Sequence, residues 1–128
     1  MLRWLNIIMA VLFGLCVVVQ YNDPDAVLWI LIYAYAAAVT AMAVANKYTV
    51  LSVIGFVGFV AGFAYLSPGI LQIDNPSELI TDIRMDSPDV EVAREAMGLL
   101  ISSLWLLVLS VVWYRRRKGR PAPVEDCR

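Results

Sequence analysis

Four long stretches of the chain contain no aspartate, glutamate, lysine or arginine. They cover residues 4–22, 26–46, 48–73 and 96–114. A helix needs about 20 apolar residues to cross the roughly 30 Å hydrocarbon core of a bilayer, and each stretch meets that length. A soluble four-helix bundle would instead need a polar stripe along the outer face of each helix, and these stretches carry none. The pattern predicts an all-α membrane protein with four transmembrane helices in a bundle.

Residues that cap or break helices set the expected boundaries. We expect transmembrane helices over about residues 4–20, 25–46, 48–66 and 96–114, forming a single domain over 1–118 with a short cytoplasmic tail over 119–128. Pro24 suits the first position of the second helix. Asn46-Lys47 is a very short link, so the second and third helices should form a tight antiparallel hairpin.

Two prolines mark the ends of the long polar connection between the third and fourth helices. Pro68 should end or sharply kink the third helix, because proline removes a backbone donor and clashes with the preceding turn. Ser87-Pro88-Asp89 should begin the fourth helix outside the membrane. Between them, residues 77–86 place Leu79, Ile80 and Ile83 on one helical face. This spacing predicts a short amphipathic helix between the third and fourth helices.

Composition agrees with a membrane protein and the charges give its orientation. The 128 residues are 61% apolar and 16% charged, and the mean hydropathy is +0.73. One side of the predicted membrane holds eight bases, including Lys47 and the run from Arg115 to Lys118, and the other holds only Arg84 and Arg94. The positive-inside rule then places both termini in the cytoplasm. The membrane itself is expected to be a bacterial inner membrane or an equivalent membrane. The net charge of −1 is the sum of two unequal sides. The outer side has nine acids and two bases, and the cytoplasmic side has eight bases and two acids.

Missing residue types exclude several kinds of chemistry. The chain has no histidine, so a His-based metal site, haem ligation by histidine and a Ser-His-Asp or Cys-His nucleophile are excluded. No glycine-rich phosphate loop is present, because Gly55, Gly58 and Gly62 lie inside a predicted membrane helix. No ionisable carboxylate or base lies in a helix interior, where ion pathways usually have one. We therefore expect no enzyme activity, no cofactor, no metal and no nucleic-acid partner.

Two segments resemble a known family. Gln20-Tyr21-Asn22-Asp23-Pro24-Asp25, followed by Trp29 and Tyr33, is similar to the first signature of the transmembrane protein 220 family. The segment from Glu91 to Leu99 resembles the second patch of that family, an E-x-x-R-E-x-x-G stretch that enters the last helix. The family consists of small multi-pass membrane proteins without an assigned activity. The resemblance implies the architecture and transfers no mechanism.

The candidate interaction or ligand cluster lies on the predicted outer side. Its members come from the start of the second helix and the start of the fourth: Asp23, Asp25, Trp29, Tyr33, Glu91, Arg94 and Glu95. Its carboxylates, with Gln20 and Asn22, could bind Ca²⁺ or Mg²⁺, which prefer oxygen ligands. Alternatively, the acids cap helix N-termini and pair with Arg94, because the helix dipole favours negative charge there.

The function expected from these features is that of an accessory or interaction protein in the membrane. Its partners would be the lipid bilayer and other membrane-protein subunits or a second copy of the chain. Gly58 and Gly62 form a small-xxx-small pattern for close helix packing, within the chain or between chains. The basic tail after Tyr114 sets topology or attracts anionic lipid. The alternative function is binding or transport of a cation or small polar solute through the outer acidic cluster.

Overall fold

The computed structural model describes residues 1–71 and 88–120. Regular structure in these residues is entirely helical: α1 (Leu2–Val19), a 3₁₀ turn η1 (Gln20–Asn22), α2 (Ala26–Val44), α3 (Leu51–Ile70) and α5 (Pro88–Lys118). The four long helices are each long and apolar enough to cross a membrane. The prediction of an all-α protein with four transmembrane helices is confirmed. The amphipathic helix expected over residues 77–86 and the tail beyond residue 120 lie outside the described residues.

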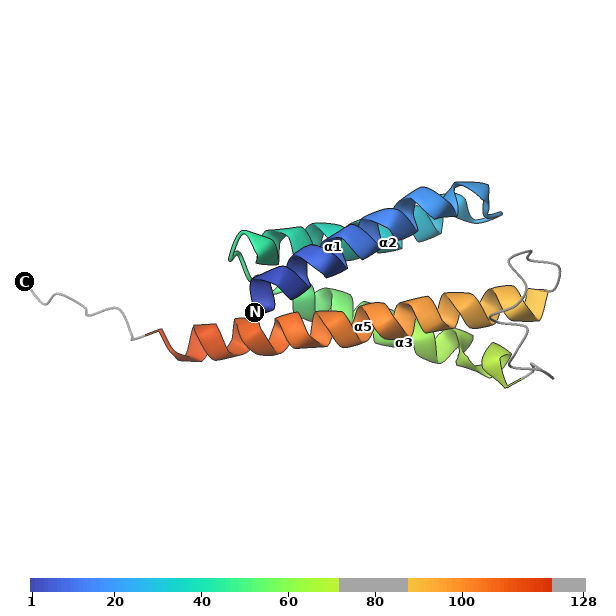
Figure 1. The fold of residues 1–128 in the computed structure, drawn as a ribbon. Helices are drawn as coiled ribbons and strands as arrows, with labels where there is room; N and C mark the ends of the chain where they lie inside the picture. Colours follow the sequence, from blue (N-terminus) through green and yellow to red (C-terminus); the bar gives the residue numbers. More distant parts are fainter. Residues whose placement is uncertain (72–87, 121–128) are drawn as a thin grey trace, which may run out of the picture.

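The long helices are arranged as two pairs (Figure 1). The first pair consists of α1 and α2, which pack along each other, and the second consists of α3 and α5. Among the described helices, only α2 has close backbone contacts with both members of the other pair. Helix α2 therefore joins the two pairs, and its side chains determine how they fit together.

The expected tight hairpin between the second and third helices is wrong. Helix α2 ends at Val44 and α3 begins at Leu51, so residues 45–50 form a longer link, and the two helices belong to different pairs. Asn46 takes a left-handed backbone conformation with φ of 59°, which asparagine tolerates better than most residues. The chain reverses at that point, and α3 then packs on α5 instead.

The core lies where α2 faces α5. Tyr33, Ala36 and Val39 on α2 are buried against a cluster that includes Leu99 and Leu106 of α5. Outward-facing side chains remain apolar and exposed, as a surface in contact with lipid requires. The buried hydroxyls of Thr40 and Ser110 donate to carbonyls of their own helix, as the Thr40 Oγ1 does to the Ala36 oxygen at 2.7 Å, whereas the buried Ser102 hydroxyl has no hydrogen-bond partner in the structure.

Glycines allow α3 to approach its neighbours closely. A Cβ at Gly55 would lie 2.6 Å from the Tyr35 ring and 2.8 Å from Leu106, and one at Gly62 would lie 3.1 Å from Leu99. Gly58 has open space around it. Of the predicted Gly58 and Gly62 pair, only Gly62 therefore lies at a close contact within the chain.

Helix α3 includes Pro68 and ends two residues later at Ile70, close to the end that this proline predicts. Proline cannot donate to the carbonyl four residues earlier, which here is the carbonyl of Ala64. The Ser67 hydroxyl donates to that oxygen at 3.0 Å. The serine therefore supplies the hydrogen bond that the proline removes, and the helix passes through the position.

The molecule has an acidic end and a basic end, which lie at opposite ends of the helices (Figure 1). The acidic end carries Asp23 and Asp25 beside the α1–α2 turn and Glu91 and Glu95 in the first turns of α5. The basic end carries Arg3, Lys47, Arg115, Arg116, Arg117, Lys118 and Arg120. Helix α5 has 31 residues and is about 46 Å long at 1.5 Å per residue. The hydrocarbon core is only about 30 Å thick, and charged residues flank the charge-free run 96–114 of α5 on both sides, so both ends of the helix are expected to lie outside the core.

Candidate functional site

Two aromatic side chains of α2 face the first turns of α5. Trp29 and Tyr33 are four residues apart, so they lie on the same face of the helix. Their ring centroids are 6.2 Å apart with an interplanar angle of 37°. Trp29 is 4% exposed and Tyr33 is 7% exposed, so this face of α2 is covered by the rest of the protein.

Each of these two side chains contacts a different residue of α5. The Tyr33 hydroxyl lies against Gly98, where a Cβ on residue 98 would collide with it. One turn closer to the acidic end, the side chain of Trp29 lies near Glu95 and favours its charged form through a hydrogen-bonding interaction that lowers the pKa of that carboxyl. The indole N–H must be the donor, because the indole nitrogen cannot accept. In both contacts, one residue comes from the first family-like segment, over residues 20–33, and the other comes from the second, over Glu91–Leu99.

A cavity of about 160 Å³ lies at this junction. Its walls combine carboxylates, one guanidinium, an amide and two aromatic rings: Gln20, Asp23, Trp29, Tyr33, Glu91, Arg94 and Glu95. Six of the seven residues of the predicted cluster line it. Asp25 does not, and Gln20, a candidate oxygen ligand from the sequence, does. Asn22 is exposed and does not line the cavity.

A second, more apolar cavity of about 320 Å³ adjoins the first. Trp29 and Glu95 line both cavities, and Asp25 lines only the second. The remaining walls come from α2, α3 and α5: Leu28, Ile32, Gly62, Tyr65, Leu66 and Leu99. Sequence reasoning missed this part, because nothing in the pattern of apolar residues distinguishes a cavity wall from a lipid-facing surface.

The chain is similar to a known protein family over most of its length. The family model described as transmembrane family 220, helix, matches residues 12–111. The chain belongs to transmembrane family 220. The matched region includes all seven residues that line the 160 Å³ cavity. No solved structure matches the chain.

Electrostatics at the cavity of this family 220 protein centre on Glu95. This residue lies just before the charge-free run over 96–114, at the projecting end of α5. Burial, followed by the negative charge of Glu91, raises the pKa of Glu95 to about 7, and Asp23 and Asp25 add to the shift. The hydrogen bond from Trp29 acts in the opposite direction. Glu95 therefore changes charge near neutral pH, in a setting where burial and three carboxylates oppose its ionisation.

Asp25 does not cap α2 in the way that the sequence predicts. Asp25 occupies the N-cap position of α2, but its side chain makes no capping hydrogen bond. Pro24 precedes that residue and so does not occupy the first helical position. Among the side chains that the structure describes, no group of three or more Asp, Glu, Cys or His residues is placed to hold a metal ion.

Proposed function

We propose that this protein is a non-enzymatic membrane protein that binds a small organic cation at its acidic end. One observation carries the proposal. Carboxylates from two separate parts of the chain converge on a cavity whose other walls include Trp29 and Tyr33. A cluster that served only to cap helices would have no need of a shared cavity with aromatic walls.

The chemistry of the cavity favours a cationic ligand. Asp23, Glu91 and Glu95 outnumber the one guanidinium of Arg94 in its lining. Aromatic faces attract cations through the ring quadrupole, and the attraction grows when water is excluded. A buried tryptophan beside carboxylates therefore suits an ammonium group better than it suits an anion. The cavity of about 160 Å³ restricts the ligand to a small one.

A divalent metal ion is a poorer fit than an organic cation. Calcium takes six to eight oxygen ligands and magnesium requires a near-octahedral set, so both need several closely placed oxygens. The described residues contain no group of three acids close enough for this. The membrane-spanning runs also carry no acid or base, which favours binding at the surface over ion-coupled transport.

A binding titration in a neutral detergent tests the proposal. Choline is the probe, and its uncharged isostere 3,3-dimethylbutan-1-ol is the matched ligand control. We expect saturable binding of choline, with Glu95→Gln weakening the affinity by about tenfold, equivalent to ~1.4 kcal/mol. Asp25→Asn removes the same charge from a nearby residue outside the cavity and should leave the affinity within about twofold, because solvent and salt screen exposed charges.

Three outcomes would overturn the proposal. Equal binding of choline and its uncharged isostere would show that charge is not recognised. An equal loss of affinity in Glu95→Gln and Asp25→Asn would indicate general attraction to a negative surface. Saturable binding of Mg²⁺ or Ca²⁺ without binding of choline would restore the metal-ion alternative.

We propose that the protein lies in a bacterial inner membrane or an equivalent membrane. In the proposed orientation, the acidic end faces outside and both termini lie in the cytoplasm. The excess of lysine and arginine at the basic end supports it. Single cysteines at Tyr21 and Gly119, in a Cys16→Ser/Cys127→Ser background, provide the test. A membrane-impermeant maleimide applied to intact cells should label position 21 and leave position 119 unlabelled. The reverse pattern would contradict this orientation.

An accessory role in a larger membrane complex stays a prediction. The exposed faces of the helices are apolar, which suits contact with lipid and contact with partner helices equally well. Affinity purification at native expression addresses it directly. Subunits that co-purify reproducibly in a mild detergent would support the role, and their absence would contradict it.

A further inference from the structure

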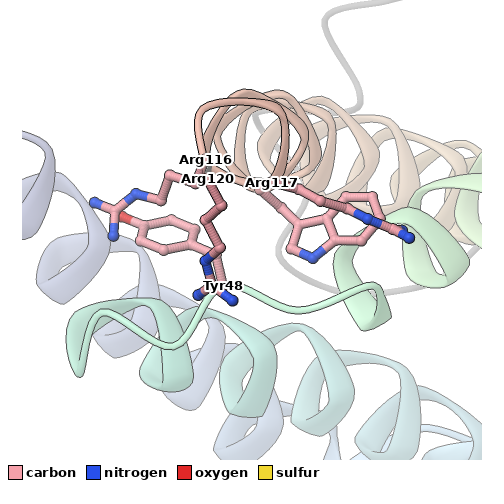
Figure 2. A pocket seen from close by; sticks show the side chains of 5 residues that line it. Tyr48, Arg116, Arg117 and Arg120 are labelled. Carbon is pink, nitrogen blue, oxygen red and sulfur yellow. The ribbon is translucent and has the colours of Figure 1, made fainter. Parts of the chain in front are cut away.

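A second pocket, at the opposite end of the molecule, is lined by arginines and aromatic rings. It has a volume of about 280 Å³ and is formed by Tyr48, Trp113, Arg116, Arg117 and Arg120. Tyr48 lies on the link between α2 and α3, and the other four residues come from the last turns of α5 and the residues just after it. Figure 2 shows Arg116 and Arg120 on the Tyr48 side of this pocket and Arg117 on the other.

Contacts with the aromatic rings hold two of the arginines in place. The guanidinium carbon of Arg116 lies 4.4 Å from the centre of the Tyr48 ring. That of Arg117 lies 5.4 Å from the centre of the Trp113 ring. Tyr48 is itself fixed by the buried Asn6 of α1, whose Nδ2 donates to the Tyr48 hydroxyl at 3.0 Å. Contacts within the protein therefore hold the side chains of this pocket in defined positions, which a run of basic residues on a tail would not require.

The charge of this pocket is not balanced by acids elsewhere in the described chain. The acidic residues whose side chains are described all lie at the acidic end: Asp23, Asp25, Glu91 and Glu95. Guanidinium groups bind phosphate through parallel N–H donors, with geometric specificity as well as charge. Three guanidinium groups around one pocket thus fit a phosphate group.

The position of the pocket along α5 indicates where that phosphate would come from. Trp113 is the next-to-last residue of the charge-free run, and the arginines follow directly after it. Tryptophan and tyrosine favour the level of the lipid headgroups. Anionic lipids attract basic residues at this level by about 1 kcal/mol per residue. A lipid phosphate would lie at the same depth as the pocket.

We propose that Tyr48, Trp113, Arg116, Arg117 and Arg120 form a binding site for the phosphate-bearing headgroup of an anionic phospholipid. This site is separate from the acidic cavity and does not depend on the function proposed for it. A basic tail that only sets topology would attract anionic surfaces in proportion to its charge. The structure instead assigns the interaction to particular arginines, and this difference can be measured.

The test compares two double variants of equal charge. Arg116→Gln/Arg117→Gln removes two guanidinium groups from the pocket. Arg115→Gln/Lys118→Gln removes two charges from the same last turns of α5 without changing the pocket lining. Binding of short-chain phosphatidylglycerol to the purified protein in neutral detergent is measured by native mass spectrometry. Phosphatidylcholine of the same chain length serves as the ligand control.

We expect the pocket variant to weaken phosphatidylglycerol binding by about tenfold or more, based on ~1 kcal/mol for each basic residue. The control variant should lose less than about threefold, because Arg115 and Lys118 are exposed and do not line the pocket, so they act on a bound headgroup only through screened charge. Far-ultraviolet circular dichroism of both variants establishes that they are folded. Equal losses in the two variants, or equal binding of phosphatidylglycerol and phosphatidylcholine to the unaltered protein, would overturn the proposal.

A second arm distinguishes a lipid from a free phosphate. Inorganic phosphate is titrated against the bound phosphatidylglycerol. We expect competition only at concentrations far above those of the lipid, because the free ion lacks the acyl chains that keep the headgroup at this depth. Binding of inorganic phosphate that is as tight as that of the lipid would overturn assignment of the site to a lipid headgroup.

Discussion

The hydroxyl of Tyr33 on α2 lies against Gly98 on α5, at a position where any Cβ would collide with it. The two residues are 65 positions apart in the sequence and belong to different helix pairs. Since α2 alone joins those pairs by close backbone contacts within the described helices, this contact lies at the centre of the fold. The space left by the missing side chain of Gly98 fixes how closely α2 approaches α5.

Gly98→Ala is expected to destabilise the protein. The added methyl group collides with the hydroxyl of a tyrosine that is itself buried, so α2 and α5 must separate or Tyr33 must move. Overpacking of this kind costs about 1–3 kcal/mol in the free energy of unfolding. Thermal unfolding in detergent measures the effect.

Gly58→Ala is the matched control for this substitution. Nothing lies within 4 Å of a Cβ at Gly58, and alanine is the better helix former by about 1 kcal/mol. This variant should be as stable as the unaltered protein or slightly more stable. Equal destabilisation by the two substitutions would contradict the close approach at Gly98.

The stability of the protein should fall as the pH rises through neutrality. The folded protein holds the proton of Glu95 up to about pH 7, whereas the unfolded chain releases it near the ordinary value of 4.5. The unfolded state therefore binds fewer protons across this interval, so raising the pH favours unfolding. We expect the melting temperature to decrease between pH 5 and pH 8, and Glu95→Gln to reduce that decrease.

Glu91→Gln provides an internal check on the cause of this pH dependence. Glu91 is the charged neighbour that most strongly opposes ionisation of Glu95. Its removal should move the midpoint of the pH dependence to lower pH without abolishing it. A melting curve for Glu95→Gln with the same pH dependence as the unaltered protein would assign the effect to other groups.

Tyr48→Phe should destabilise the basic end by removing a hydrogen bond from inside the protein. Asn6 is fully buried, and its Nδ2 donates to the Tyr48 hydroxyl, while its Oδ1 has no hydrogen-bond partner in the structure. Loss of the hydroxyl leaves the donor unsatisfied as well, at a cost of about 1–2 kcal/mol. Thermal unfolding measures it. Tyr65→Phe removes an 84% exposed hydroxyl and should have no effect, so equal losses in the two variants would contradict this account.

The four membrane helices could be predicted from sequence because the absence of charge over a bilayer's length has one physical explanation. The pairing of those helices could not. The short polar segment at Asn46-Lys47 predicted a tight hairpin, but pairing depends on the fit between surfaces, and Gly62 lets α3 approach Leu99 of α5 closely. Pro68, in contrast, indicated the end of α3 to within two residues.

The candidate cluster was predictable as a set of residues and not as a cavity. Motif spacing placed Trp29 and Tyr33 on one face of α2 and Glu91 and Glu95 on one face of α5. These two faces meet because the α1–α2 pair packs on the α3–α5 pair in one particular way. The sequence pattern does not encode that packing. Asp25 illustrates the limit: it lies two residues from Asp23 in the same motif, yet it lines the neighbouring apolar cavity and not the one that Asp23 lines.

A double-mutant cycle between Trp29 and Glu95 tests the central claim, that these two residues join the α2 and α5 segments into one site. Unfolding free energies are measured at pH 8 for Trp29→Phe, Glu95→Gln and the double variant. We predict a coupling energy of about 1–2 kcal/mol, as expected for a hydrogen bond to a charged group. A control cycle that pairs Glu95→Gln with Trp4→Phe, at the opposite end of the molecule, should give a coupling energy near zero. Additive effects of Trp29→Phe and Glu95→Gln would contradict the claim.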